Sequence, residues 1–127
     1  MSDDVLIPLR APFVDERGVI QNLVDGEFGS VAVIESKKGA VRANHYHKTD
    51  FHYCWLQRGS MIYAHRPAGQ TTAAQRWTIK AGQLFYTPPQ YEHAMRFLED
   101  SVMVVAARNH RGMEEYESDT IRIASIL

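Results

Sequence analysis

Three histidines lie close together in one short stretch near the middle of the chain. Of the six histidines in the sequence, His45, His47 and His52 fall within eight consecutive positions. Imidazole is the commonest protein ligand for transition metals. His45 and His47 are two residues apart, so in an extended strand their side chains leave the same face. The spacing therefore predicts two metal ligands from one strand and a third, His52, from the start of the next.

A fourth imidazole, His93, follows about forty residues later, in GQLFYTPPQYEHAMRF. A sheet closed into a barrel can aim side chains from several strands at one interior point. Three or four neutral imidazoles suit Fe, Ni, Zn or Mn and leave open positions for water or substrate. We therefore expect a divalent transition metal bound by His45, His47, His52 and His93. The alternative is that some of these histidines only form hydrogen bonds within a polar pocket.

The pH dependence of such a site follows from imidazole chemistry. A protonated imidazole has no lone pair to donate to a metal. Free imidazole has a reference pKa of about 6.5, so we expect metal affinity to fall as the pH drops through about 6.

Two tyrosines are candidate proton donors. Tyr63 and Tyr86 lie on strands expected near the histidines, although aromatic residues in small barrels mostly serve packing. We take these two as candidate catalytic residues.

Three more side chains have both a functional and a structural interpretation. His65 could contact a ligand, but a lone histidine at a strand end is more often a satisfied structural residue. Arg42 could bind an anion, although a solvated strand edge explains it as well. His110 lies in the turn-like sequence ARNHRG, where we expect solvent exposure.

Short strands separated by turn signals would position these groups. Regular spacing of about ten residues between such strands predicts an all-β sandwich or barrel. The alternating apolar run at residues 30–36 predicts a buried strand. The carboxyl-terminal residues 114–127 are open to two interpretations, one last strand or a short helix. Strands are expected within residues 5–24 (two strands around a turn that ends at Gly18), 30–36, 41–47, 50–59, 60–66, 73–82, 83–89, 91–99 and 101–109.

The strand that begins at His52 has two chemically different faces. His52 and Cys54 share one face, and Phe51, Tyr53 and Trp55 share the other. If the histidine face is the barrel interior, the aromatic stripe needs a cover from outside. Aromatic residues are enriched in interface cores, so we expect a homodimer. The alternative is that the amino-terminal strands cover the stripe within one chain.

Composition bounds the remaining possibilities. A chain of 127 residues with 45% hydrophobic and 23% charged residues is typical of one globular domain. A formal net charge of −1 with both signs dispersed predicts neither a nucleic-acid surface nor a lipid surface. Residues 1–10 contain no long apolar run, which argues against a secretory signal or a transmembrane span. The single cysteine cannot form an internal disulfide, so we expect a cytoplasmic protein that binds a small molecule.

The histidine stretch resembles the first sequence motif of the cupin family. In that motif Gly39, His45, His47 and Gly59 fall in register, and His52 occupies the position where the family has Glu. The later stretch resembles the second motif, in which Gly82, Pro88 and His93 are in register. In this second motif Gln90 replaces a Gly and Phe97 replaces an Asn. Two motifs in the right order are far more specific than one.

This resemblance implies a fold and a set of activities. The implied fold is the cupin double-stranded β-helix, a jelly-roll β-barrel, as a single domain over residues 1–127. The tetrapeptide at residues 15–18 is similar to a step near the start of RmlC-like cupins, the sugar-nucleotide epimerases and ketoisomerases. In that group a barrel histidine moves a proton next to a sugar carbonyl, which makes His45 and His47 candidate catalytic residues. A metal would polarise the carbonyl as a Lewis acid.

Three functions remain open at this point. The first is an isomerase or epimerase that acts on a small polar carbonyl compound or a sugar nucleotide. The second is a metal-dependent dioxygenase, and the third is a non-catalytic cupin that binds a sugar or another small ligand. The cupin resemblance also implies a dimer.

Overall fold

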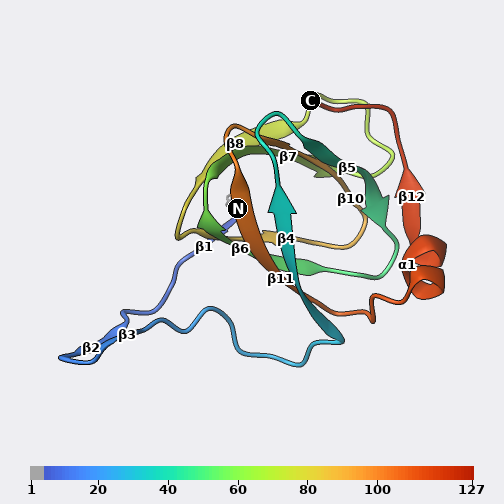
Figure 1. Ribbon diagram of the computed structural model, residues 1–127. Helices are drawn as coiled ribbons and strands as arrows, with labels where there is room; N and C mark the ends of the chain where they lie inside the picture. Colours follow the sequence, from blue (N-terminus) through green and yellow to red (C-terminus); the bar gives the residue numbers. More distant parts are fainter. Residues whose placement is uncertain (1–4) are drawn as a thin grey trace.

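Two five-stranded antiparallel sheets face each other in the computed structural model, which describes residues 5–127 (Figure 1). The first sheet has the order β1 (Leu6–Ile7), β9 (Leu84–Thr87), β6 (His52–Arg58), β11 (Ser101–Ala107) and β4 (Ser30–Ser36). The second has the order β12 (Thr120–Arg122), β5 (Val41–His47), β10 (Tyr91–Phe97), β7 (Ser60–Pro67) and β8 (Gln75–Lys80). A separate hairpin pairs β2 (Phe13–Asp15) with β3 (Gly18–Ile20), and one helix, α1, spans Met113–Asp119.

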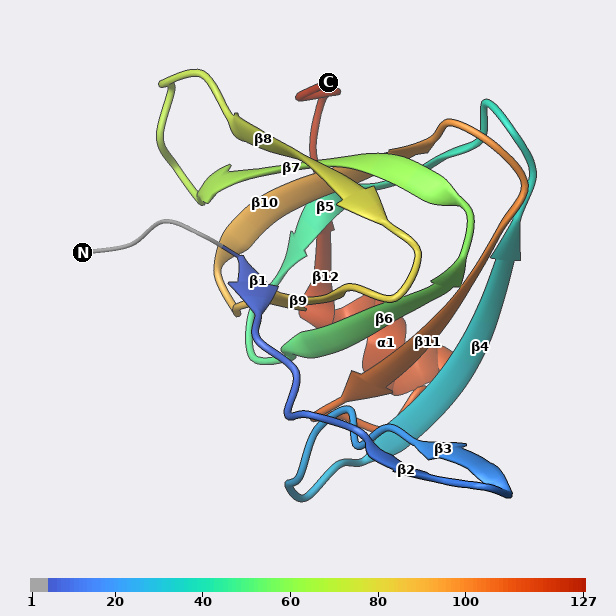
Figure 2. The same ribbon diagram turned by 90° about the vertical axis from the view of Figure 1, so that its left-hand side faces the viewer.

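The chain passes repeatedly from one sheet to the other. β4 belongs to the first sheet, β5 to the second, β6 to the first and β7 to the second, and the same alternation recurs from β9 to β11. Figure 2 shows the resulting barrel, with β5, β10 and β7 on one side and β6, β11 and β4 on the other. The predicted jelly-roll β-barrel is therefore confirmed.

The barrel interior is polar at one end and apolar at the other. Along β6 the inward residues run from His52 through Cys54 to Leu56, and all three are buried. On β10 the inward side runs from His93 to Phe97. Burial of the apolar end stabilises the fold through the hydrophobic effect, and the polar end can form a functional site.

The turn between β6 and β7 has room only for glycine. Gly59 has φ +101°, and a Cβ atom there would lie 2.8 Å from the backbone oxygen of Asp100. The close approach and the positive φ explain why glycine is needed here, directly after β6 ends at Arg58, one residue before the predicted end at Gly59.

Strand β4 differs from the prediction of a buried strand. Val31 and Val33 are each 67% exposed, because β4 is the edge strand of the first sheet and one of its faces points outward. The sequence is apolar on both faces here, so its pattern alone resembles that of a buried strand.

A hairpin toward the amino terminus and a helix toward the carboxyl terminus lie outside the two sheets. Hairpin β2–β3 projects from the barrel (Figure 1). Its large apolar side chains are exposed. Those side chains are Phe13, Val14, Val19 and Ile20. Near the carboxyl terminus the structure contains both predicted alternatives, since helix α1 runs directly into strand β12.

Two of the sequence predictions involve residues 1–4, which lie outside the described residues. These are the extent of the single domain from residue 1 and the argument from the first ten residues. Within residues 5–127 no helix has the length and apolar character needed to cross a membrane.

Candidate active site

The first histidine strand, β5, contains a bulge just before the histidines. Ala43 and Asn44 both have positive φ, +71° and +56°, and the register of β5 against β10 shifts at this point. His45 and His47 leave one face, as predicted, and both are buried. The irregular residues reset the alternation, so Arg42 lines the same cavity as His45. Counting along a regular strand places Arg42 on the opposite face.

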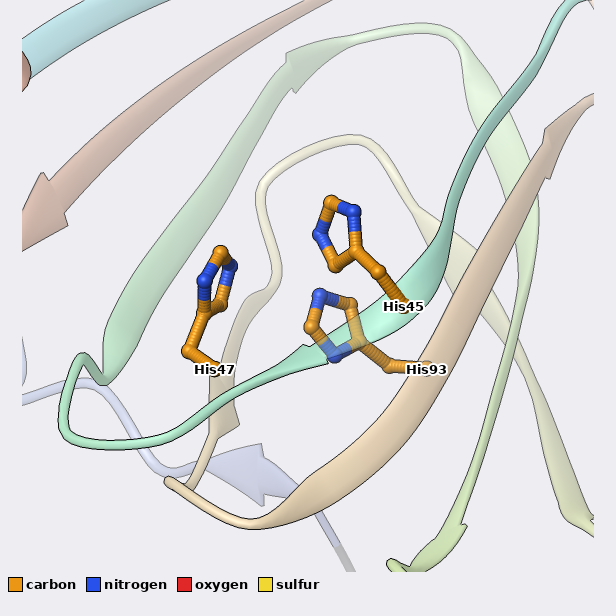
Figure 3. A group of neighbouring side chains, drawn as sticks. All are labelled: His45, His47 and His93. Atoms are coloured by element: carbon orange, nitrogen blue, oxygen red, sulfur yellow. The ribbon is translucent and has the colours of Figure 1, made fainter. Parts of the chain in front are cut away.

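Three imidazoles come together at the polar end of the barrel. The ligand nitrogens of His45, His47 and His93 lie within 4.8 Å of one another (Figure 3). β5 and β10 are neighbours in the second sheet, and His93 lies opposite His45 in their register. Two adjacent strands thus bring together residues that are almost fifty positions apart in the sequence.

Hydrogen bonds determine which nitrogen of His93 and His47 carries a proton. Nδ1 of His93 lies 3.0 Å from the backbone oxygen of Tyr91, which can only accept, so its Nε2 keeps a lone pair. The Thr120 hydroxyl donates to the backbone oxygen of Tyr116 at 2.6 Å, so it accepts from Nδ1 of His47 at 3.3 Å. Nε2 of His47 is buried and has no hydrogen-bond partner within residues 5–127. Two buried lone pairs in one cluster fit a bound metal ion, and the Nδ1 hydrogen bonds are those that orient metal-binding histidines.

Burial keeps these imidazoles neutral. It lowers the pKa of His45 to about 3, with a further lowering from the neighbouring His47 and His52. Burial likewise lowers the pKa of His47 to about 4, and that of His93 well below 6.5. At neutral pH all three are therefore in the form that binds metal.

His52, predicted as the fourth metal ligand, forms a hydrogen-bonded pair with Asp50. It lies on β6 in the opposite sheet, with its ring centroid 4.9 Å from that of His47. Its Nε2 lies 3.0 Å from Oδ2 of Asp50. Burial alone would raise the pKa of Asp50, but hydrogen bonds from His52 and from the backbone N–H of Asn109 lower it overall. The carboxylate is therefore ionised and accepts from Nε2, which leaves Nδ1 of His52 with the lone pair.

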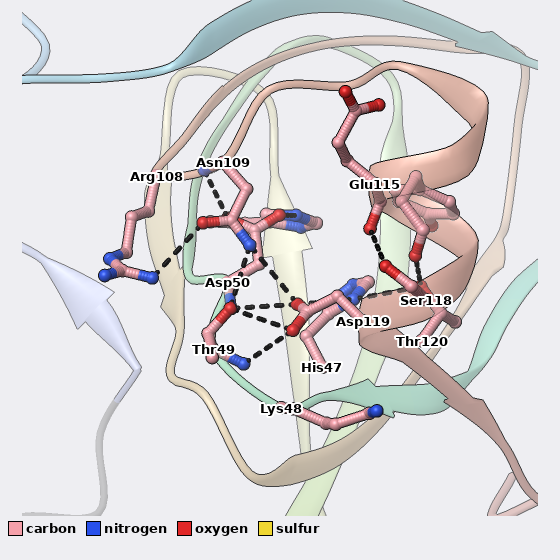
Figure 4. Close-up of polar contacts among 12 residues, drawn as sticks. His47, Lys48, Thr49, Asp50, Arg108, Asn109, Glu115, Ser118, Asp119 and Thr120 are labelled. Atoms are coloured by element: carbon pink, nitrogen blue, oxygen red, sulfur yellow. Dashed lines mark hydrogen bonds and ion pairs between the residues drawn. The ribbon is translucent and has the colours of Figure 1, made fainter.

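A polar network fixes the loop that bears Asp50. Asp119, at the end of α1, accepts hydrogen bonds from the backbone N–H of Thr49 at 3.0 Å and from its hydroxyl at 2.8 Å (Figure 4). The other carboxylate oxygen of Asp119 accepts from the backbone N–H of Asp50 at 3.0 Å. Asn109 donates its backbone N–H to Asp50 at 2.9 Å. Asp119 of the carboxyl-terminal helix thereby holds the loop between β5 and β6 in place.

Tyr116 and Arg111 complete the site, and the sequence analysis identified neither. The Tyr116 ring lies 5.5 Å from that of His47 and 6.4 Å from that of His45, between centroids. Burial raises the pKa of Tyr116, so its hydroxyl stays protonated. Arg111 lies over the Tyr116 ring, with its guanidinium carbon 4.8 Å from the centroid.

Several of the site residues line a cavity of about 130 Å³. Its polar wall comes from Arg42, His45, His52, His93, Arg111 and Tyr116, and its apolar wall includes Cys54, Met95, Met103 and Val105. A separate apolar hollow lies between β1 and the turn before β9, but no titratable side chain lines it. The histidine cavity brings titratable side chains together with members of the candidate metal group, which suits it for acid–base or metal chemistry.

The two tyrosines predicted as catalytic lie away from this cavity. Tyr63 is buried in the core, and its hydroxyl is hydrogen-bonded to Thr87 at 2.8 Å and to His65 at 3.2 Å. Tyr86 is on the outer face of the first sheet, with its ring 4.7 Å from that of Tyr53. His110 is exposed, as predicted.

One signal in the sequence could have revealed the Asp50 pair. Asp50 and His52 are two residues apart, so an extended chain places both on one face. No comparable signal exists for Tyr116, Arg111 or Asp119, because their positions depend on how the carboxyl-terminal segment folds back onto the barrel.

Comparisons with known proteins give a likeness in structure only. No protein-family model matches the chain, and no curated protein matches it in sequence. The 3,4-ketoisomerase QdtA from Thermoanaerobacterium thermosaccharolyticum, in complex with TDP, matches with a TM-score of 0.74 and 19% identity over 93% of this chain and 86% of its own. The 3'-monoepimerase ChmJ from Streptomyces bikiniensis, in complex with dTDP-quinovose, matches with a TM-score of 0.75 and 17% identity over 91% of this chain and 67% of its own.

A longer protein also contains the same fold. The capsular polysaccharide assembling protein CapF from Staphylococcus aureus matches with a TM-score of 0.69 and 21% identity over 93% of this chain. The chain spans only 35% of the length of CapF. Taken together, the architecture and these likenesses show that the chain has the RmlC-like cupin fold found in sugar epimerases and ketoisomerases.

Proposed function

We propose that the protein is a metal-dependent enzyme of the isomerase or epimerase type that moves a proton on the carbon next to a carbonyl group. One observation carries this proposal. The hydrogen-bonded pair of His52 and Asp50 faces the group formed by His45, His47 and His93 at the polar end of the barrel. A base beside a metal-binding group is a combination that promotes enolisation of a carbonyl compound.

Each part of the site has a role in this chemistry. His45, His47 and His93 would hold the ion, which supplies Lewis-acid polarisation of the substrate carbonyl when bound. Nδ1 of His52 takes the proton from the adjacent carbon. The carboxylate of Asp50 orients the His52 ring and stabilises the imidazolium that forms. Apolar walls at Met95 and Met103 exclude water from the reacting carbon.

The structural neighbours favour a sugar nucleotide as the substrate. QdtA has been crystallised with TDP and, as a mutant, with TDP-4-keto-6-deoxyglucose, and ChmJ with dTDP-quinovose. These ligands combine a sugar with a diphosphate, and the keto sugar has the carbonyl that the proposed reaction needs. We therefore propose a keto sugar, or a related small polar carbonyl compound, as substrate. Fe, Ni, Zn and Mn all suit the imidazole donors.

A homodimer would cover two apolar surfaces of the single chain. Val33, Val104 and Trp55 lie side by side across the outer face of the first sheet. Phe28 covers part of the aromatic stripe by packing its ring 6.0 Å from that of Tyr53, but Val33 remains exposed. Hairpin β2–β3 projects nearby with four exposed apolar side chains. We propose that a second copy packs on this outer face and on the hairpin.

The cellular location stays a prediction. Burial raises the pKa of the Cys54 thiol, so this cysteine is an inert core residue. We propose a cytoplasmic location, because the chain offers no second cysteine for an internal disulfide.

The test is turnover of a keto sugar nucleotide in D₂O. Untagged protein, loaded in turn with Fe(II), Ni(II), Zn(II) or Mn(II), is incubated with TDP-4-keto-6-deoxyglucose and followed by NMR. We expect deuterium to enter the carbon next to the carbonyl and an isomer or epimer to form. Oxygen consumption without isomerisation would instead indicate a dioxygenase. Binding without deuterium incorporation would indicate a non-catalytic binding protein, and either outcome would refute the proposal.

A further inference from the structure

We infer that Arg111 binds an oxyanion of the substrate, a phosphate or a carboxylate, at the mouth of the histidine cavity. This inference rests on the proposed function, because it names the charged group that the substrate must carry.

Arg111 is held at the cavity but is not neutralised. Its side chain is exposed and also lines the cavity, and the Tyr116 ring lies 4.8 Å below the guanidinium carbon. Stacking on an aromatic ring orients a guanidinium without occupying its N–H donors. Across residues 5–127 no carboxylate forms an ion pair with Arg111, and no hydrogen bond from its side chain is present. With respect to residues 5–127, its five N–H donors are therefore free for a ligand.

Other arginines of the molecule are already engaged. Arg42, on the same cavity, donates to the Ser36 hydroxyl at 2.8 Å and to the backbone oxygen of Glu35 at 3.0 Å. Arg122 forms a two-pronged ion pair with Glu117, with both contacts at 2.9 Å. Arg111 differs from both in having an aromatic support in place of an acceptor.

The cavity has an excess of positive charge. Arg42 and Arg111 line it, and its wall contains no Asp or Glu among the residues that the structure describes. Arg111 lies in the lining of this cavity, so its charge would attract an anion to it.

Because the cavity is small, only the reacting part of a larger substrate can enter it, and the charged part must lie outside. The cavity of about 130 Å³ is smaller than the roughly 300–1,000 Å³ of pockets that enclose a drug-sized ligand, so it cannot enclose a whole sugar nucleotide. The rest of a larger substrate must lie across the mouth, where Arg111 is exposed. A guanidinium fork matches the paired oxygens of a phosphate or carboxylate.

Anion binding by metal-free protein tests this inference independently of turnover. Isothermal titration calorimetry would compare TDP, malonate and uncharged thymidine on EDTA-treated wild-type protein and on Arg111→Gln. We expect wild type to bind TDP or malonate and not thymidine. Binding of TDP alone would identify the group as phosphate, and binding of malonate alone would identify it as carboxylate. Arg111→Gln should weaken the affinity for the anion at least about tenfold, as expected for loss of a charge-assisted pair.

Arg108→Gln is the matched control. Arg108 belongs to the same connection between β11 and α1 and is exposed, but it does not line the cavity. The inference is overturned if neither anion binds wild type, if Arg111→Gln binds within twofold of wild type, or if Arg108→Gln loses as much affinity. A melting curve for each variant would verify folding. Anion binding without any deuterium exchange would refute the proposed function and leave the role of Arg111 intact. Deuterium exchange without anion binding would support the proposed function and refute the role of Arg111.

Discussion

Nε2 of His52 donates a hydrogen bond to Oδ2 of Asp50 across 3.0 Å, and both side chains are buried at the polar end of the barrel. The bond fixes the tautomer of His52 and leaves Nδ1 as its basic atom. Asp50 lies in the loop that Asp119 anchors, and His52 begins β6 two positions later, so both residues of the pair are held in place.

Replacing Asp50 by Asn tests the base directly. The amide cannot stabilise an imidazolium at His52, so we expect kcat for proton transfer to fall by about 10²- to 10⁴-fold. Metal content should stay unchanged, because His45, His47 and His93 are untouched. Rates would come from NMR-monitored deuterium exchange, with the exposed Asp25→Asn as the control variant. A kcat within a factor of three of wild type would show that the pair has no catalytic role.

Replacing His52 by Glu separates the two roles considered for this residue. A carboxylate here restores the residue usual in the cupin motif and accepts the same cations, so we expect metal to be retained. Deuterium exchange should nonetheless fall by at least about a hundredfold, because the base is gone and the new carboxylate lies beside Asp50. Retained exchange would contradict the assignment of His52 as the base.

The buried histidines make the metal-free protein sensitive to acid. The folded-state pKa values of His45 and His47, about 3 and about 4, lie below the unfolded value of about 6.5. Between these values the unfolded chain binds more protons, so stability is fully present above pH 6.5 and is lost as the pH falls toward 4. Each of these two histidines should lower the free energy of unfolding by about 2 kcal/mol at pH 5 relative to pH 7.

Urea unfolding of metal-free protein at pH 5 and pH 7 would measure this change. His47→Ala should show a smaller loss between the two pH values, and the exposed His110→Ala should match wild type. Equal stability of wild type at both pH values would contradict the burial argument. The same low pKa values move the expected competition between protons and metal from about pH 6 to about pH 4.

The dimer surface is tested by a charge on the exposed edge strand. Val33→Lys places an ammonium on the outer face of β4, where it should abolish association and leave the single chain folded. Sedimentation at micromolar concentration should show a dimer for wild type and a 14.5 kDa species for the variant. Val41→Lys, on an exposed position of the second sheet, is the control. A monomeric wild type would refute the dimer.

Much of the fold could be predicted from the sequence because its signals are local. Alternation along the strands and the turn glycines mark where each strand begins and ends, and the two motifs indicate their order. At Gln90 the residue type differs from the cupin motif, but the backbone conformation does not. It adopts φ +62° where the motif has Gly, and its backbone N–H donates to the oxygen of His47 at 2.8 Å. The backbone requirement is preserved although the residue type has changed.

The remainder of the site depends on contacts between segments far apart in sequence. The bulge at Ala43 and Asn44 is maintained partly by the carboxyl-terminal segment, since the backbone oxygen of Asn44 accepts from Ile123 at 3.0 Å. Asp119 reaches Thr49 across seventy positions. Neither residue type nor periodicity encodes such pairings, so the sequence could not place Arg42 in the cavity or Tyr116 against the histidines.

The metal content of untagged protein tests the central claim most directly. Elemental analysis after reconstitution with Fe(II), Ni(II), Zn(II) or Mn(II) should find close to one ion per chain in wild type. His47→Ala and His93→Ala should each lose most of it, because the remaining groups no longer enclose the ion, whereas His65→Ala and His110→Ala should retain it. Wild-type protein without metal, or full metal content in both His47→Ala and His93→Ala, would contradict the three-histidine site.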